Sequence, residues 1–237
     1  FKQMLCFLFD GTSRHLAHFD ALAKDPGYAA AIETSLEDMA SSHTIKRFYR
    51  AFSPVRTYKF RHLLQQLFLW RLVVAKPNVI ELNIDTMVMD NDQAPKRHGV
   101  KPTYKKVLGF QPLQMTWGRY IIDAVFRGGD KHSNNGDTVE KMIRHVVRMI
   151  RTRYSQTVPI IIRMDSGFFD QDLFAVMEQL DIGFICGGKF YGDIKTMIEA
   201  LPEAAYDNHF GNTDEDVWQC FEFGDRRKSW NRFYRVT

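Results

Sequence analysis

Two aspartates in this sequence each end a short apolar run, and their carboxylates are the side chains best suited to chemistry. Asp85 closes "NVIELNID" and Asp165 closes "VPIIIRMD". If the two runs form neighbouring parallel strands, the carboxylates lie about 5 Å apart at one edge of a sheet. Carboxylates that close repel each other unless a cation lies between them. The pair therefore predicts a site for Mg²⁺ or Mn²⁺, which prefer oxygen ligands, and metal-assisted displacement at a phosphodiester.

Each aspartate also has a purely structural interpretation. Asp85 can be a turn residue at the end of its strand, and Asp165 or Ser166 can cap the helix that follows. In the metal-site interpretation, Ser166, Asp170 and Asp172 are the expected capping residues, which leaves Asp165 free for an ion. The choice between the two interpretations depends on whether the strands that carry the aspartates lie side by side.

Residues 77–195 contain the elements that must position the pair. The apolar patterns predict strands in 79–85, 105–117, 119–129, 158–165 and 183–189, and helices in 138–154 and 170–180. Three strands, a helix, a strand, a helix and a short strand form a mixed α/β order. A ribonuclease H-like mixed sheet flanked by helices fits this order, and its fourth strand lies beside its first. The order thus predicts that Asp85 and Asp165 share one edge.

Residues 1–76 are predicted to form a small all-α region. Within "SSHTIKRFYRAF", Ile45 and Phe48 fall on one side of a helix, and Arg47 and Arg50 fall on the other. A basic helix of this kind could lie in a DNA groove as in a helix-turn-helix, although plain packing explains such helices equally well. We therefore treat Arg47 and Arg50 as candidate DNA contacts.

Basic side chains gather in four segments, although the net charge is only +4. A solvated surface is the simpler explanation of any one segment, whereas four together indicate a polyanionic partner. Lys101, Lys105 and Lys106 follow the first aspartate and are expected to contact a phosphate backbone. Arg163 lies two residues before Asp165 on a strand, so it points to the same side and is expected to pair with the acids or with DNA phosphate.

Composition narrows the class of protein. With 237 residues, of which 45% are hydrophobic, the chain can form one large domain or a small domain attached to a larger one. Because no apolar run approaches the roughly 18 residues that a membrane span needs, and the cysteines are too widely spaced for a disulfide or zinc framework, a cytoplasmic protein is expected. Because the chain begins at Phe1 without a methionine and ends on a strand-like run, we expect it to be a fragment.

Several stretches of the sequence carry a resemblance to a known family. They are "IDTMVMD", "HGVKPTYKKVLGFQPLQ", "RGGDKHSNNGDT" and "IIIRMDSGFFDQDLFAVMEQLDIGFICGGK". Together with the helical region before them, they resemble the DDE transposases of the IS1380 group of bacterial insertion sequences, within the broader IS4-like class. The similarity covers essentially the whole chain.

The resemblance implies a ribonuclease H-like core in which Asp85 and Asp165 are the first and second catalytic, metal-ligating acids. It implies Mg²⁺ or Mn²⁺ as cofactor, double-stranded DNA at transposon ends and target as substrate, a homodimer on DNA, and a nucleoid-associated place in the bacterial cytoplasm. It also implies a third acid, a glutamate on a helix that follows a β-rich insertion. Residues 196–237 resemble the start of that insertion and stop before such a helix. Glu222 is the nearest substitute, and a surface carboxylate is its better interpretation.

Metal-dependent strand cleavage and strand transfer at insertion-sequence ends is the function that we expect. A structure-selective nuclease of the same fold stays open, because acids at strand ends do not distinguish hydrolysis from transfer. A catalytically inactive, transposase-derived DNA-binding protein also stays open. His132 and Ser133 could contact the metal or a phosphate, although the Asn-Gly turn that follows them explains their presence without a functional role.

Overall fold

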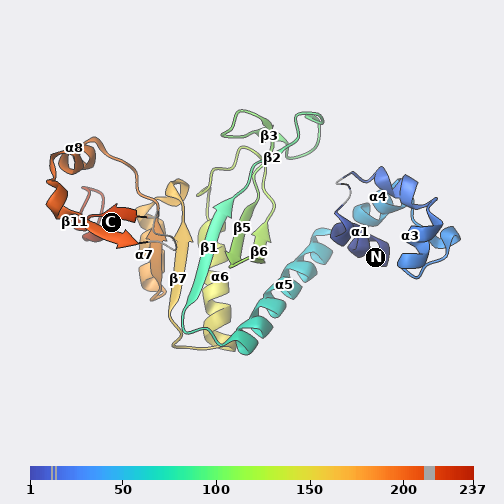
Figure 1. Ribbon diagram of the computed structural model, residues 1–237, viewed down its shortest axis with the longest axis horizontal. Helices are drawn as coiled ribbons and strands as arrows, with labels where there is room; N and C mark the ends of the chain where they lie inside the picture. Colours follow the sequence, from blue (N-terminus) through green and yellow to red (C-terminus); the bar gives the residue numbers. More distant parts are fainter. Residues whose placement is uncertain (12, 14, 211–216) are drawn as a thin grey trace. The chain divides into compact units, whose positions relative to one another are not determined.

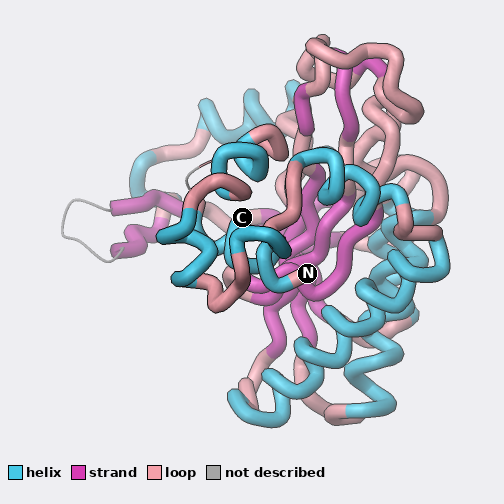
Figure 2. The backbone as a smooth tube through the Cα atoms, turned by 90° about the vertical axis from the view of Figure 1, so that its right-hand side faces the viewer, coloured by secondary structure: helices cyan, strands magenta, loops and turns pink. Residues whose placement is uncertain are grey.

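The computed structural model describes residues 1–11, 13, 15–210 and 217–237. The chain forms two compact units, Phe1–Leu63 and Leu64–Thr237. Helix α5 (Pro54–Ala75) contributes residues to both units. Each unit buries its own cluster of apolar side chains, and Figure 2 distinguishes the helices, strands and loops along the backbone.

The first unit is helical, as the sequence predicts. It contains α1 (Lys2–Asp10), α2 (His18–Leu22), α3 (Pro26–Ala31), the 3₁₀ turn η1 (Leu36–Asp38), α4 (Ser42–Arg50) and the beginning of α5. Its core is formed by Met4, Phe7, Phe19, Leu22 and Ile45. Because Ile45 is the residue that α4 contributes to this core, the basic side of α4 faces away from it.

Helix α4 is attached to α2 through its first residues. Ser41 caps the helix, since its hydroxyl accepts a hydrogen bond from the backbone N–H of Thr44 at 3.4 Å. The carboxylate of Asp20 accepts two hydrogen bonds from Ser42, at 2.7 Å from the hydroxyl and 2.8 Å from the backbone N–H. These bonds hold the pKa of Asp20 below its usual value. The start of α4 is therefore fixed by both a cap and a contact to another helix.

The second unit is built on a five-stranded mixed sheet (Figure 1). Its strands are β1 (Ile80–Thr86), β5 (Leu113–Trp117), β6 (Tyr120–Val125), β7 (Ile160–Met164) and β8 (Gly183–Cys186). Their order is β6-β5-β1-β7-β8. The β1–β5 and β5–β6 pairs are antiparallel, and the β1–β7 and β7–β8 pairs are parallel. This order and these directions are those of a ribonuclease H-like sheet, so the predicted fold class is confirmed.

Alternate residues of the central strand face the core. In β1, Ile80, Leu82 and Ile84 are buried, whereas Glu81 and Asp85 are exposed. This is the period of two that a strand with one covered face requires. The pattern of the sequence therefore decides which side chains of β1 reach solvent, and Asp85 is one of them.

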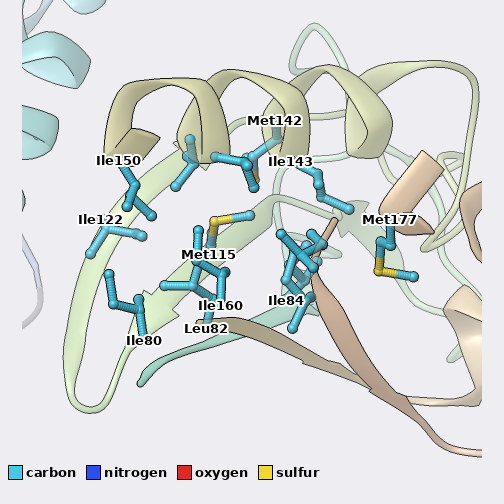
Figure 3. Close-up of a cluster of buried hydrophobic side chains, with 14 of the residues drawn as sticks. Ile80, Leu82, Ile84, Met115, Ile122, Met142, Ile143, Ile150, Ile160 and Met177 are labelled. Carbon is cyan, nitrogen blue, oxygen red and sulfur yellow. The ribbon is translucent and has the colours of Figure 1, made fainter. Parts of the chain in front are cut away.

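Three helices cover the buried face of the sheet. They are α6 (Thr138–Arg153), α7 (Gln171–Gln179) and the second half of α5. Figure 3 shows Met142, Ile143 and Ile150 of α6 pointing toward the strands, with Met177 of α7 at one end of the cluster. Leu72 of α5 is fully buried in the same cluster. Burial of this much apolar surface makes the sheet a rigid base for side chains at its edges.

The opposite face of the sheet carries exposed side chains on its central strands. Glu81 of β1 and Arg163 of β7 form an ion pair at 2.7 Å across this face, and Ile185 of β8 is 59% exposed. Asp85 follows on the same side of β1 as Glu81. The first aspartate of the predicted pair is therefore accessible to solvent and to a ligand.

A small second sheet extends past the end of β1 (Figure 1). It consists of β2 (Met89–Asp90), β4 (Leu108–Phe110) and β3 (Lys101–Pro102), in that order. The turn at Gly129 packs directly against it. A Cβ atom on Gly129 would lie 2.3 Å from the carbonyl oxygen of Lys101 and 2.5 Å from that of Gly109. Glycine is required there because the two backbones approach too closely for any side chain.

The remaining elements follow the main sheet. They are the 3₁₀ turns η2 (Ser166–Phe168) and η3 (Glu203–Ala205), helix α8 (Gly192–Ala200), and the antiparallel pairs β9 (Asp207–Phe210) with β10 (Val217–Cys220) and β11 (Phe223–Asp225) with β12 (Tyr234–Val236). Of the helices in the described ranges, not one combines the length and apolar character that a bilayer crossing requires.

Candidate active site

The register of β1 and β7 brings the two aspartates to the same edge of the sheet. Ile80 pairs with Ile160, and the same offset of eighty residues holds to the last pair, Ile84 with Met164. Asp85 and Asp165 are the next residues along each strand. Since neighbouring strands lie about 4.8 Å apart, the two aspartates are neighbours at the carboxyl ends of parallel strands. The predicted pairing of the strands is confirmed, and the metal-binding role of the pair stays a prediction.

One oxygen of each carboxylate accepts a backbone hydrogen bond. Asp85 Oδ1 accepts from the N–H of Thr86 at 2.6 Å, and Asp165 Oδ1 accepts from the N–H of Gly167 at 3.0 Å. Asp165 thereby caps η2. An ionised carboxylate has two oxygens and about four acceptor sites, so each aspartate keeps acceptor capacity for an ion. The backbone bonds fix the orientation of both side chains.

The expectation that only neighbours of Asp165 act as caps is wrong in part. Asp170 does cap α7, accepting from the N–H groups of Asp172 at 2.8 Å and Leu173 at 3.4 Å. Asp165 caps the separate 3₁₀ turn before that helix, because the chain makes one turn between the strand and α7. Capping and ion binding therefore do not exclude each other at Asp165.

The residues that follow β8 pack against Asp165 and add no acidic side chain to this edge of the sheet. A Cβ atom on Gly187 would lie 3.0 Å from the backbone nitrogen of Ser166. The Cys186 thiol donates a hydrogen bond to the carbonyl oxygen of Asp165 at 3.4 Å. Burial, and after it the negative charge of Asp165, raise the pKa of this thiol to about 12. The donors that the two aspartates offer at this edge are carboxylate oxygens, which suit Mg²⁺ or Mn²⁺.

A buried polar cluster lies directly beside the pair, and the sequence did not reveal most of it. The Thr86 hydroxyl lies 3.3 Å from the Ser133 hydroxyl and within 3.4 Å of the Gln111 amide. Arg127 donates from Nε to the carbonyl oxygen of Gln111 at 3.1 Å and from Nη1 to that of Ser133 at 3.3 Å. Gln111 and Arg127 sit in runs whose pattern indicates only strands. The sequence did offer Ser133 as a possible contact to the metal or a phosphate, although the Asn-Gly turn after it gave a structural explanation of the same residue.

Acidic side chains do not assemble into a larger cluster in the described ranges. There, His, Cys, Asp and Glu form no group of three or more that could hold a metal ion. Glu222, the nearest substitute for a third acid, forms an exposed ion pair with Arg235, whose Nε lies 3.0 Å from Oε2. Glu222 is thus a surface carboxylate, as the sequence predicts.

The basic residues singled out from the sequence fall at three places. Arg163 pairs with Glu81 at 2.7 Å on the exposed face, and not with the two aspartates as expected. In the strand register Arg163 lies opposite Asn83, and its side chain extends to Glu81, two residues back along β1. Lys101 lies on β3, and Lys105 and Lys106 lie in the turn between β3 and β4; all three are exposed. They belong to the small sheet that extends past the end of β1 (Figure 1).

Arg47 and Arg50 lie in the first unit on the exposed side of α4. With His43 and Lys46 they line a surface hollow of about 620 Å³. The four residues recur at intervals of three and four, so they form one stripe along the helix. The sequence around them holds no Asp or Glu between positions 39 and 80, and its lysines and arginines are Lys46, Arg47, Arg50, Arg56, Lys59, Arg61, Arg71 and Lys76. This segment therefore carries only positive formal charges.

Comparisons with known proteins identify a family for this chain and structures to which it is similar. The model of the family described as Transposase DDE domain group 1 matches residues 4–237. In structure, the chain is similar to the piggyBac transposase in its synaptic complex with hairpin DNA, with a TM-score of 0.40 and 14% identity over 83% of this chain and 46% of that one. It is also similar to the Mos1 mariner transposase in a paired-end complex with Mn, with a TM-score of 0.33 and 10% identity over 84% and 70% of the two chains. The chain thus spans less than half the length of the piggyBac transposase, and no curated protein matches it.

Proposed function

Because the chain belongs to the family of group 1 DDE transposase domains, we propose that Asp85 and Asp165 are two metal-ligating acids of an enzyme that cleaves and joins DNA strands. The observation that carries the proposal is the register of β1 and β7, which makes the two residues neighbours at one sheet edge. The motifs around them favour the IS1380 group of bacterial insertion sequences, and hence action at the bacterial nucleoid.

The residues at this edge fit a hard divalent cation. Both carboxylates are exposed, and each accepts a hydrogen bond from a backbone N–H of its own. Mg²⁺ or Mn²⁺ bound by Asp85 and Asp165 supplies an activated water or hydroxyl and stabilises charge on the leaving oxygen of an in-line phosphoryl displacement. The chain itself supplies two preorganised negative ligands and a surface for the DNA strand.

Two protein carboxylates and substrate phosphate oxygens suffice to hold such an ion, although the family resemblance implies a third acid. We propose that residues 196–237 belong to the β-rich insertion that the resemblance implies before that acid, a glutamate. The exposed face that carries Asp85 is accessible to a further element. A catalytically inactive DNA-binding derivative is the second candidate, and the lack of a third acidic ligand in the described part of the chain favours it.

Removal of the metal tests the proposed reaction. The full-length protein is assayed for strand cleavage of a duplex that carries the DNA bordering its own coding sequence. We expect EDTA to abolish cleavage, and Mg²⁺ or Mn²⁺ to restore it, because the acids act only through the ion. Cleavage that persists in EDTA contradicts a metal-dependent transposase, and an absence of cleavage with every divalent ion favours the inactive DNA-binding derivative.

DNA contacts are proposed for Lys101, Lys105 and Lys106 near the acids, for Arg163, and for Arg47 and Arg50 on α4. Transposition requires the two DNA ends of the mobile element, so we propose that a homodimer binds these two ends. Each phosphate contact that is lost reduces the slope of log K against log salt concentration by about 0.9.

Changing all three lysines of the β3–β4 region to glutamine is therefore expected to reduce that slope by about 3, measured by fluorescence anisotropy with a labelled duplex. The matched control changes Lys2, Lys141 and Lys195, each of which pairs with a carboxylate of the chain, at 3.2, 2.6 and 3.8 Å. It removes the same charge and is expected to leave the slope nearly unchanged. Equal slopes in both triple variants argue against a DNA contact at β3–β4.

A further inference from the structure

Ser133 contacts both of the turns that carry the aspartates. Its hydroxyl lies 3.3 Å from that of Thr86, the residue after Asp85. On the other side it lies against Gly167, where an added Cβ atom would be only 2.7 Å from Ser133 Oγ. Gly167 is the residue whose N–H holds Asp165. One half-buried hydroxyl therefore lies between the two halves of the proposed site.

Arg127 fixes the segment that carries this hydroxyl. Its side chain is buried, with 7% exposed, and two of its nitrogens donate to the carbonyl oxygens of Gln111 and Ser133. Nη2 is buried and has no hydrogen-bond partner among the described residues. Burial lowers the pKa of Arg127, because removal from water disfavours the charged form. A buried polar group with an unpaired nitrogen is unusual in a folded protein and calls for an explanation such as a functional role.

Gln111 holds the same segment from the other side. It is 2% exposed, and with its amide nitrogen facing the neighbouring carbonyls it donates to Gly129 at 3.2 Å and Lys131 at 3.3 Å. The carbonyls of Gly129, Lys131 and Ser133 are thus all bound by buried side chains. An exposed turn before a helix does not need this many internal bonds. The backbone of this segment is therefore held in place by hydrogen bonds, as the side chains of the two aspartates are.

Capping of α6 does not account for the Ser133 side chain. The first turn of α6 begins after Asp137, four residues later, so Ser133 is not its cap. The turn ahead of α6 is made by Asn135 and Gly136, the latter with a φ of 62°. The hydroxyl is free to rotate and has a donor that can turn from Thr86 toward a ligand. Lys131 and His132, next to it, are exposed.

We propose that Ser133 is a substrate-contacting residue of this site, whose hydroxyl donates to a phosphate oxygen of the DNA strand held at Asp85 and Asp165, and that Arg127 is the residue that positions it. This inference rests on the proposed function. Hydroxyl side chains are common donors to DNA phosphates, and here the hydroxyl is placed by backbone that a buried guanidinium holds.

The test is a double-mutant cycle. It combines the Ser133→Ala substitution in the protein with DNA in which a single phosphate is made neutral. The full-length protein is assayed on a duplex of the DNA bordering its coding sequence, with single phosphates near the cleaved bond replaced in turn by methylphosphonate. We expect Ser133→Ala to lower kcat/KM on unmodified DNA about 10- to 100-fold, the range for a hydrogen bond to a charged group. At one phosphate, the methylphosphonate that weakens the wild type is expected to have no further effect on Ser133→Ala.

Two further variants distinguish a substrate contact by Ser133 from a structural role of this residue. Ser133→Thr keeps the hydroxyl and is expected to restore most of kcat/KM, whereas Arg127→Lys keeps the charge but not the fork of donors and is expected to lose sensitivity at the same phosphate. The cycle is measured both as kcat/KM and as Kd for the duplex, so that it has a result even where cleavage is slow. An unchanged methylphosphonate profile in Ser133→Ala overturns the proposal.

Binding of Mn²⁺, measured by titration calorimetry, distinguishes this proposal from the one it rests on. Ser133→Ala is expected to bind Mn²⁺ as the wild type does, because the hydroxyl contacts the substrate and not the ion. Wild-type Mn²⁺ affinity in Asp85→Asn overturns the metal site. Wild-type kcat/KM in Ser133→Ala, with Mn²⁺ binding lost in Asp85→Asn, overturns only the role of Ser133.

Discussion

Asp85→Asn and Asp165→Asn are each expected to lower the rate of DNA strand cleavage by the full-length protein about 100- to 1,000-fold. A metal ion contributes several kcal/mol of charge stabilisation in the transition state, and each 1.36 kcal/mol is a factor of ten in rate. Asparagine has the shape of aspartate, and its carbonyl oxygen can still accept the N–H of Thr86 or Gly167 that holds the native side chain. The substitution therefore removes the charge and leaves the local backbone bonds in place.

The matched control is Asp170→Asn, five residues after Asp165. Asp170 caps α7, and asparagine is an equally good cap, so this variant also loses one carboxylate without losing a helix start. We expect it to cleave DNA and to bind Mn²⁺ as the wild type does. A loss of cleavage in Asp170→Asn as large as in the other two variants shows that net charge near this edge, and not ligation by a pair, decides activity. Full activity in either Asp85→Asn or Asp165→Asn contradicts the assignment of that residue.

The sequence predicts the sheet and the neighbouring strand ends because those features depend on period and order. Alternation of Ile80, Leu82 and Ile84 with polar residues identifies the covered face of β1. The order of strands and helices then leaves few arrangements, and in the ribonuclease H-like one the strand of Asp165 lies beside that of Asp85. The structure contains both features, and the register between β1 and β7 is unbroken.

What surrounds the aspartates could not be predicted, because it depends on contacts between segments far apart in the chain. Arg127 donates a hydrogen bond to the carbonyl oxygen of Ser133. The hydroxyl of Thr86 contacts that of Ser133, although the two residues are 47 positions apart in the sequence. A pattern of residue types contains no signal for such pairs. Arg163 illustrates the same limit. The period of two gave its side of the strand correctly, but its ion pair with Glu81 joins residues 82 positions apart in the sequence.

The segment that leads to Ser133 depends on one close approach of backbones, and Gly129→Ala is expected to destabilise the second unit by about 3 kcal/mol, at the upper end of the range for overpacking. The added Cβ would lie 2.3 Å from the carbonyl oxygen of Lys101 and 2.5 Å from that of Gly109. Both obstacles are backbone, so neither can rotate away as a side chain can. In a chain of this size we expect the Tm to fall by about 6–12 °C in a calorimetric scan.

Gly188→Ala is the control for this substitution, because a Cβ atom there meets nothing within 4 Å and its φ is not positive. Its Tm is expected to change by no more than about 2 °C. The two backbones that meet at Gly129 carry Lys101 on one side and lead to Arg127 and Ser133 on the other. Separating them should therefore also lower kcat/KM for DNA cleavage at temperatures well below the Tm, where the variant is still folded. A Gly129→Ala protein with the Tm and kcat/KM of Gly188→Ala would show that the small sheet and the Ser133 segment do not depend on this contact, and the positioning argued for Ser133 would lose its basis.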